Sequence, residues 1–152
     1  MICGSRRKDG RMREILFKAK RIDNGEWIEG NHVYLENAHY IVPLYIEWNE
    51  TEQRESPMFI RVDRKTLCQY TEFEDENKNR IWENDIVSFI DYSSTESGYV
   101  EHNCVGRIAW DCECACFRVS GTLSAESWEV LQDCVIIGNV FDNPELLRQD
   151  GG

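Results

Sequence analysis

Two carboxylates and a histidine are the residues of this sequence whose types best suit proton-transfer chemistry. Glu83 and Asp85 flank Asn84 at the start of a strand-like segment, and His102 lies further along the chain, near the cysteine cluster. Asp63 is a further carboxylate candidate. Carboxylates and imidazoles are the groups that most often move protons in enzymes. They support, as the alternative function, an enzyme of unknown reaction that uses Glu83, Asp85 and His102.

Motifs that would define a reaction are missing from the sequence. It contains no phosphate-binding glycine loop, no G-x-S-x-G and no H-E-x-x-H. The two other histidines, His32 and His39, lie in strand-like contexts, where packed or surface histidines are commoner than catalytic ones. We therefore expect no catalytic residues and no cofactor as the main interpretation.

A cysteine cluster is the one place where metal chemistry is suggested. Cys112, Cys114 and Cys116 lie near Cys104 and His102, and on a straight strand the three clustered thiols would share one face. The spacing is C-x-C-x-C, however, and not the paired C-x-x-C that usually binds zinc. The stretch "WDCEC" is typical of a hairpin turn, which would separate the thiols. We expect no metal site, and the odd total of seven cysteines favours reduced thiols.

The charge is strongly negative and unevenly distributed. The net charge is −11, yet residues 1–21 carry eight basic and two acidic residues, a local charge of +6. The rest of the chain then carries −17 and would repel a phosphate backbone, so nucleic-acid binding is disfavoured except through residues 6–21. Such acidity suits a basic protein partner, although it also serves solubility.

The two ends of the chain and its lack of long apolar runs predict its organisation. No apolar run approaches the roughly 20 residues of a membrane span, and the charged start "MICGSRRKDGRM" is not followed by the apolar region of a signal peptide. We expect a cytoplasmic protein in a bacterial host, without membrane contact. We also expect a disordered basic extension over residues 1–11, one β domain over residues 12–148 and a disordered tail over residues 149–152.

Short extended segments separated by turn residues predict a mainly β fold. "EILFKAKRI" and "WIEGNHVYL" form the clearest hairpin, in which Asn24 and Gly25 would supply positive φ angles. "VGRIAW" and "CFRVSG" predict a second hairpin, and "CVIIGNV" predicts an apolar strand. The expected fold is a compact, partly barrel-like single domain of antiparallel strands, with one or two short helical turns and less than about a fifth of its residues helical.

The remaining segments predict loops and short helices. Glu47 to Pro57 holds four glutamates and no aliphatic residue, which is typical of a solvated loop. "SAESWEVL" predicts two helical turns capped by Ser124, and "DNPELL" predicts a helix start with Asn143 as its cap and Pro144 next.

Turn residues surround the first group of carboxylates. Asn79 and Asn84 suit the left-handed conformation, so the chain would bend at both positions. Asp85 would accept hydrogen bonds from backbone amides at the second bend. This structural role is the favoured interpretation of Asn79, Asn84 and Asp85.

Two central segments and two flanking ones resemble the YopX family of phage and prophage proteins. "VDRKTLCQYT" is similar to the family's D-x-x-T-x-x-Q-Y-T segment, and "IWENDIV" to its I-Y-E-G-D-I-V segment. "KAKRIDNGEWIEG" and "VIIGNVFDNPELL" are similar to its opening hairpin and closing segment, so the resemblance covers residues 13–147. The signature residues are Asp63, Thr66, Gln69, Tyr70, Thr71, Ile81, Glu83, Gly138, Asn139, Asp142, Asn143 and Pro144.

Departures from the family pattern fall mostly at glycines. Cys68, Glu72, Asn79 and Asn84 stand where the family often has glycine, and asparagine still tolerates a positive φ there. The resemblance implies a compact, mostly β, partly barrel-like domain, and no established activity.

The main functional hypothesis combines this resemblance with the acidic composition. It is a non-enzymatic phage or prophage accessory protein that binds a host or phage protein, or forms a homo-oligomer. Trp48 and Tyr92, which we expect in polar loops, are the aromatic residues expected at the surface.

Overall fold

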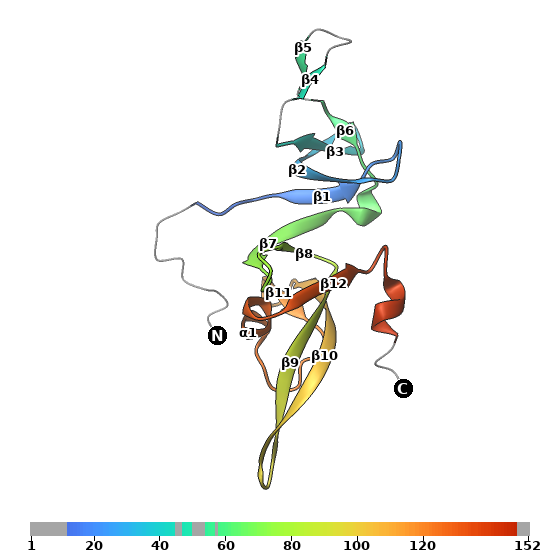
Figure 1. Ribbon diagram of the computed structural model, residues 1–152. Helices are drawn as coiled ribbons and strands as arrows, with labels where there is room; N and C mark the ends of the chain where they lie inside the picture. The colour runs from blue at the N-terminus through green and yellow to red at the C-terminus, as the bar shows by residue number, and fades with distance from the viewer. Residues whose placement is uncertain (1–11, 45–46, 50–53, 57, 149–152) are drawn as a thin grey trace. The chain divides into compact units, whose positions relative to one another are not determined.

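The structure is a computed structural model that describes residues 12–44, 47–49, 54–56 and 58–148, with the backbone alone for residues 47–49 and 54–56. These residues form mainly antiparallel β-structure with one α-helix and two short 3-10 turns, which confirms the predicted fold class (Figure 1). The sheets have open strand orders, so the partly barrel-like expectation does not extend to a closed barrel among the described strands. No described helix has the length and apolar character needed to cross a membrane.

The chain divides into two compact units. The first unit is Glu14–Tyr70, and the second is Thr71–Gly152 together with Met1–Arg13. Strand β7 (Cys68–Glu74) carries the chain from the first unit into the second.

An antiparallel sheet built on two successive hairpins, β1–β2 and β2–β3, forms the first unit. Its strands run in the order β6-β3-β2-β1-β7, and Ala19, Ile41 and Val62 form its small buried core. The bounds of these elements are β1 Phe17–Lys20, β2 Trp27–Leu35, β3 Ala38–Pro43, β6 Ile60–Arg61 and the 3-10 turn η1 Arg64–Thr66.

The predicted first hairpin is present, but Asn24 acts differently from the expectation. Gly25 has φ +72°, whereas Asn24 is not among the residues with positive φ. Its Oδ1 instead accepts a hydrogen bond of 2.9 Å from the Glu26 amide. The loop is closed by the amides of Gly25 and Arg21, each donating across the turn at 2.9 Å. Four residues lie between Arg21 and Glu26, so this loop has one left-handed residue, Gly25, and not the pair that a two-residue turn needs.

The prediction of a solvated loop over residues 47–57 is wrong for residues 47–49 and 54–56, which form strands. Strands β4 (Glu47–Asn49) and β5 (Arg54–Ser56) pair antiparallel, with Trp48 opposite Glu55. Backbone pairing needs no aliphatic side chains, so the glutamate-rich composition did not reveal it. The other residues of this prediction lie outside the described part of the chain.

A second antiparallel sheet, in the order β11-β10-β9-β12, dominates the second unit. Strands β9 and β10 form its longest ladder and extend past their shorter neighbours (Figure 1). The elements are β8 Arg80–Trp82, β9 Asp85–Thr95, β10 Gly98–Asp111, β11 Cys116–Val119, α1 Ser127–Gln132, β12 Val135–Asn139 and the 3-10 turn η2 Pro144–Leu147. The predicted second hairpin and the apolar strand are thus confirmed as β10–β11 and β12.

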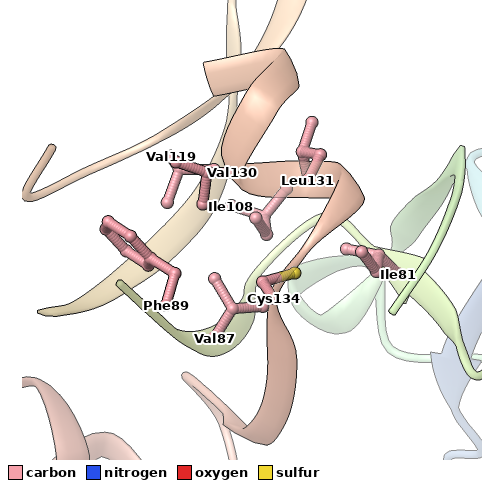
Figure 2. Close-up of a cluster of buried hydrophobic side chains, with 8 residues drawn as sticks. All are labelled: Ile81, Val87, Phe89, Ile108, Val119, Val130, Leu131 and Cys134. Carbon is pink, nitrogen blue, oxygen red and sulfur yellow. The ribbon is translucent and has the colours of Figure 1, made fainter. Parts of the chain in front are cut away.

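The core of the second unit lies between this sheet and α1. Val130 and Leu131 of the helix pack with residues of β8, β9, β10 and β11, as Figure 2 shows. Burial of each such aliphatic side chain stabilises the fold by roughly 1.5 to 3 kcal/mol. The eight members are Ile81, Val87, Phe89, Ile108, Val119, Val130, Leu131 and Cys134.

Both predicted helical segments exist. Asn143 and Pro144 begin the second segment as predicted, but the predicted cap of the first, Ser124, is wrong. Glu126, and not Ser124, occupies the N-cap of α1, and its amide donates to the Glu129 carboxylate at 2.9 Å. Residues 144–147 form a 3-10 turn whose N-cap, Asn143, makes no side-chain cap bond. The side chains of Ser124 and Asn143 bind other groups, as described below.

Candidate functional site

The bend at Glu83, Asn84 and Asp85 is held by hydrogen bonds within the fold. Asn84 has φ +70°, and its Oδ1 accepts a 2.6 Å bond from Arg107. Asp85 is buried, and its Oδ2 accepts the Trp82 amide at 2.8 Å. Both side chains therefore have bonding partners that a turn requires.

The preceding bend differs from the prediction in one residue. Lys78, with φ +64°, takes the left-handed conformation expected for Asn79. The cause is Asp75, whose Oδ1 accepts the amides of Asn77 and Asn79 at 2.9 Å each and so fixes the residue between them. Its other oxygen accepts the Ile136 amide at 3.1 Å. Burial alone would raise the pKa of Asp75, but these amides lower it below its usual value.

The three residues of the enzymatic alternative do not converge. Asp85 lies six residues from Asp91 along β9, and Asp91 is the cross-strand partner of His102. At about 3.3 Å per residue, Asp85 and His102 are roughly 20 Å apart. His102 Nε2 lies 2.7 Å from the Ser93 hydroxyl instead. Asp63, the fourth candidate, belongs to the first unit.

Asp63 and Thr66, two signature residues, attach η1 to β1. The Asp63 carboxylate accepts the Lys65 amide at 2.9 Å, and the Thr66 hydroxyl donates to the Asp63 carbonyl at 2.8 Å. The same hydroxyl accepts the Lys20 amide at 2.8 Å. In the second unit, the hydroxyl of a third signature residue, Thr71, donates to the carbonyl of a fourth, Ile81, at 2.8 Å. Each of these four signature residues thus makes a hydrogen bond that holds the backbone of the fold in place.

The closing segment is held by a compact turn. Asn139 Oδ1 accepts the amides of Phe141 and Asp142 at 3.0 Å each, and the Asn143 carboxamide accepts the Asn139 amide at 3.3 Å. A Cβ added to Gly138 would lie 2.6 Å from Asn143 Oδ1. This close approach explains a glycine at position 138.

Glu72, which stands at a family glycine, has φ +71°. A side chain in this conformation is strained because Cβ approaches the backbone. The family's preference for glycine here is thus a backbone requirement. Glu72 lies 3.8 Å from Arg13.

A buried carboxylate that sequence reasoning missed is the anchor of the segment before α1. Asp91 accepts the amides of Leu123 at 2.5 Å, and of Ser124 and Ala125 at 3.1 Å each. Burial alone would raise the pKa of Asp91, but these bonds and the Tyr92 amide lower it to about 2. The Ser124 hydroxyl donates to the Tyr92 carbonyl at 2.6 Å and lies 3.1 Å from the Asp91 carboxylate, which explains why Ser124 does not cap the helix. No local pattern connects residues 32 positions apart.

The cysteines lie as the hairpin interpretation expected. Cys112 and Cys114 are exposed in the β10–β11 turn, and an Arg118 nitrogen lies 3.0 Å from the Cys114 sulfur. Burial raises the pKa of the Cys134 thiol to about 12, so this thiol stays protonated. Across the described ranges, no three His, Cys, Asp or Glu residues are grouped closely enough to hold a metal ion.

His32 and His39 pair across β2 and β3 of the first unit. Their ring nitrogens, Nε2 and Nδ1, are 2.8 Å apart, and the rings are stacked. Burial and the charge of His39 lower the pKa of His32. The packed role expected for these histidines agrees with this arrangement.

A hollow of about 280 Å³ with several aromatic side chains in its walls lies on the second unit, and we call it the aromatic hollow. This volume lies just below the usual range for small-molecule sites, so the hollow suits one or two inserted side chains. Strands β7, β10 and β11 and helix α1 contribute its walls. It is lined by Arg13, Thr71, Phe73, Trp110, Ala115, Cys116, Phe117, Trp128 and Leu131.

Two tryptophans give this aromatic hollow its binding character. Trp110 pairs across the β10–β11 ladder with Phe117, with their rings edge to face at 5.0 Å. Trp128 reaches the hollow from α1. Trp110 is 47% exposed and Trp128 39% exposed, so both present apolar area to solvent. Of the aromatics expected at the surface, Tyr92 is half-exposed but lies in β9, and the Trp48 side chain is outside the described residues.

The sequence lacked a pattern for this hollow because its residues come from separate elements. Trp110 and Trp128 are 18 positions apart, and the fold alone brings them to one surface. The chemistry available there is apolar contact and ring stacking, with one guanidinium from Arg13.

Comparison with known proteins gives both a fold and a family. In structure, the chain is similar to the crystal structure of protein EF1440 from Enterococcus faecalis, with a TM-score of 0.54 and 20% sequence identity, covering 88% of this chain and 98% of that one. This likeness concerns the fold alone. No curated protein matches the sequence. The family described as YopX protein matches residues 16–148, nearly the whole of the described chain, and the chain belongs to this YopX family.

Proposed function

We propose that this protein is a non-enzymatic binding module whose contact surface is the aromatic hollow. The observation that carries the proposal is the convergence of half-exposed Trp110 and Trp128 on one concavity. Tryptophan is the residue most enriched among the energetic centres of protein interfaces. The inserted group would be an apolar or aromatic side chain of a partner protein.

The exposed parts of these two rings do not contribute to the stability of the fold, but a partner protein could bury them. Scattered apolar side chains are normal on a protein surface, but clustered ones around a hollow mark an interaction site. Each Å² of apolar surface left in water forgoes about 25 cal/mol of burial energy. A partner that covers Trp110 and Trp128 recovers that energy.

The proposed module is a phage or prophage protein that acts in the cytoplasm of a bacterial host. It rests on the resemblance of the signature segments and on the absence of long apolar runs in the sequence. The partner is a host or phage protein, or a second copy of the chain. Nucleic acid is a poor candidate because residues 71–152 hold 17 acidic and 5 basic residues.

An enzymatic role retains one supporting contact, between the Ser93 hydroxyl and His102 at 2.7 Å. Neither residue lines the aromatic hollow. The bonds of Asp85 and Asn84 at the bend favour a structural role for that segment over a catalytic one.

Capture from host lysate by the tagged protein tests the proposal, with Trp128→Ala as the critical variant. Tyr99→Ala is the matched control, because Tyr99 is 80% exposed in the same unit and outside the hollow. We expect a stoichiometric protein with the parent chain and with Tyr99→Ala, and its loss with Trp128→Ala. Light scattering on the same three proteins detects self-association.

Two results would overturn the proposal. One is equal capture by all three proteins, which would place the contact elsewhere. The other is the absence of both a stoichiometric partner and a Trp128-dependent oligomer. Circular dichroism on Trp128→Ala ensures that lost capture does not reflect lost folding.

A further inference from the structure

A second hollow, of about 290 Å³, lies on the other side of α1 from the aromatic hollow. Trp128 and Leu131 face the aromatic hollow, whereas Glu129, Val130 and Asp133 line the second one. Positions three or four apart share one face of a helix, which agrees with this division. The second hollow is lined by Phe89, Ile90, Tyr92, Ala125, Glu129, Val130 and Asp133.

Apolar walls and an acidic rim characterise this second hollow. Ile90 and Tyr92 of β9 are 53% and 46% exposed, so they present apolar surface to a ligand. Glu129 and Asp133, both exposed, supply two carboxylates. The Tyr92 hydroxyl lies 3.2 Å from the Glu101 carboxylate, which adds a third negative group beside the hollow. No basic residue is among the described residues that line it.

Of these two carboxylates, Glu129 lies in the first turn of α1 and accepts the Glu126 amide, which favours the helix, whereas Asp133 is placed poorly for it. Glu129 and Asp133 are like charges four residues apart, a spacing at which they repel each other. Asp133 is also the C-cap residue, at the end of the helix dipole that disfavours negative charge, and the last turn holds no basic residue. A cationic ligand between them would remove both penalties.

We propose that this acidic hollow binds a basic, amphipathic segment of a partner protein. A lysine or arginine of the segment would lie between Glu129 and Asp133, and a neighbouring apolar side chain would pack on Ile90 and Tyr92. Charge complementarity supports this occupant, because the net charge of residues 71–152 is −12. Strand β9 pairs with β12 as far as Ser88. The hollow lies along the next residues of β9, from Phe89 onward. The inference is independent of the aromatic hollow.

Labelled octapeptides provide the test, with affinity measured by fluorescence polarisation. The first alternates leucine and lysine, the second serine and lysine, and the third leucine and glutamate. The critical variant is Glu129→Gln/Asp133→Asn, in which the carboxamide oxygen introduced at position 129 still accepts the Glu126 amide, as a capping box requires. The matched control is Glu96→Gln/Glu145→Gln, which removes the same charge at exposed positions outside the hollow.

We expect the leucine and lysine peptide to bind most tightly, and the critical variant to weaken it by about tenfold or more. The control should change the affinity by less than about threefold. Tyr92→Ala should weaken the same peptide without any change of net charge, while the serine and lysine peptide should be insensitive to it.

Any of four results would overturn the inference. Equal weakening by the two double variants would mean that net charge alone attracts the peptide. Equal affinity for the first two peptides would exclude the apolar contact, and absence of binding would exclude the site. A mass change of the critical variant in light scattering would identify the hollow as a contact between two copies.

Discussion

The Asp91 carboxylate, buried in β9, lies 3.1 Å from the hydroxyl of Ser124, 33 residues later in the chain. The same carboxylate accepts the backbone amides of Leu123, Ser124 and Ala125. This one side chain therefore fixes the segment that leads into α1, and α1 forms a wall of both hollows.

Asp91→Ala should destabilise the protein by roughly 2 to 4 kcal/mol, because several buried amides lose an acceptor at once. Asp91→Asn should cost less, since a carboxamide oxygen still accepts hydrogen bonds. Urea unfolding followed by tryptophan fluorescence measures both. Ser124→Ala is the control that removes a single donor, at a cost of about 1 kcal/mol. Equal stability of Asp91→Ala and the parent chain would show that the anchor is dispensable.

Acid should weaken this anchor in a defined pH window. The folded pKa of Asp91, about 2, lies below the ordinary value of 3.8, so the folded state binds this proton less readily than the unfolded state. Its contribution is complete above about pH 4 and disappears as the pH falls towards 2. We expect Asp91→Asn to show a shallower loss of stability than the parent chain across this window.

The histidine pair of the first unit should respond at a higher pH. Burial and the charge of His39 lower the pKa of His32, so the unfolded state takes up this proton first. Stability from neutral His32 is present above about pH 6.5 and falls as the pH drops below it. His32→Gln should flatten this part of the profile in thermal melts between about pH 7.5 and 5.

At position 72, glycine should give a more stable protein than alanine, the reverse of the order expected within a strand. Because Glu72 has φ +71°, Glu72→Gly should be more stable than Glu72→Ala by about 1 kcal/mol. Both variants remove the contact with Arg13, so their difference isolates the backbone. At Glu74, an exposed residue of β7, alanine should instead exceed glycine by roughly 0.5 to 1 kcal/mol. The same sign at both positions in chemical denaturation would contradict the strain at Glu72.

Local features of the fold were predictable from the sequence where one or two residues determine the backbone. Gly25 and Asn84 both have the positive φ that turn chemistry predicts. Where another side chain competes for the same groups, the local prediction failed. Ser124 caps no helix because Asp91 binds it, and Lys78 replaces Asn79 because Asp75 holds the amides on either side.

The hollows could not be predicted because their residues meet only in the folded chain. Trp110 and Trp128 belong to β10 and α1, and Tyr92 and Asp133 belong to β9 and the end of α1. Neither pair has a periodic spacing that a sequence pattern would reveal. The YopX signature instead marked residues with structural bonds, such as Thr66, Thr71 and Asn139.

The most direct test of the proposed binding surface separates binding from folding by comparing Trp128→Ala with Asp85→Ala. The measurement is the affinity of each variant for the captured partner, by calorimetry at a temperature where circular dichroism shows both to be folded. Trp128→Ala should lose about tenfold or more in affinity. Asp85→Ala should keep the affinity but lose roughly 1 to 3 kcal/mol of stability, because the buried Trp82 amide loses its acceptor. Full affinity in Trp128→Ala together with lost affinity in a stable Asp85→Ala would contradict this proposal and place the functional site at the bend.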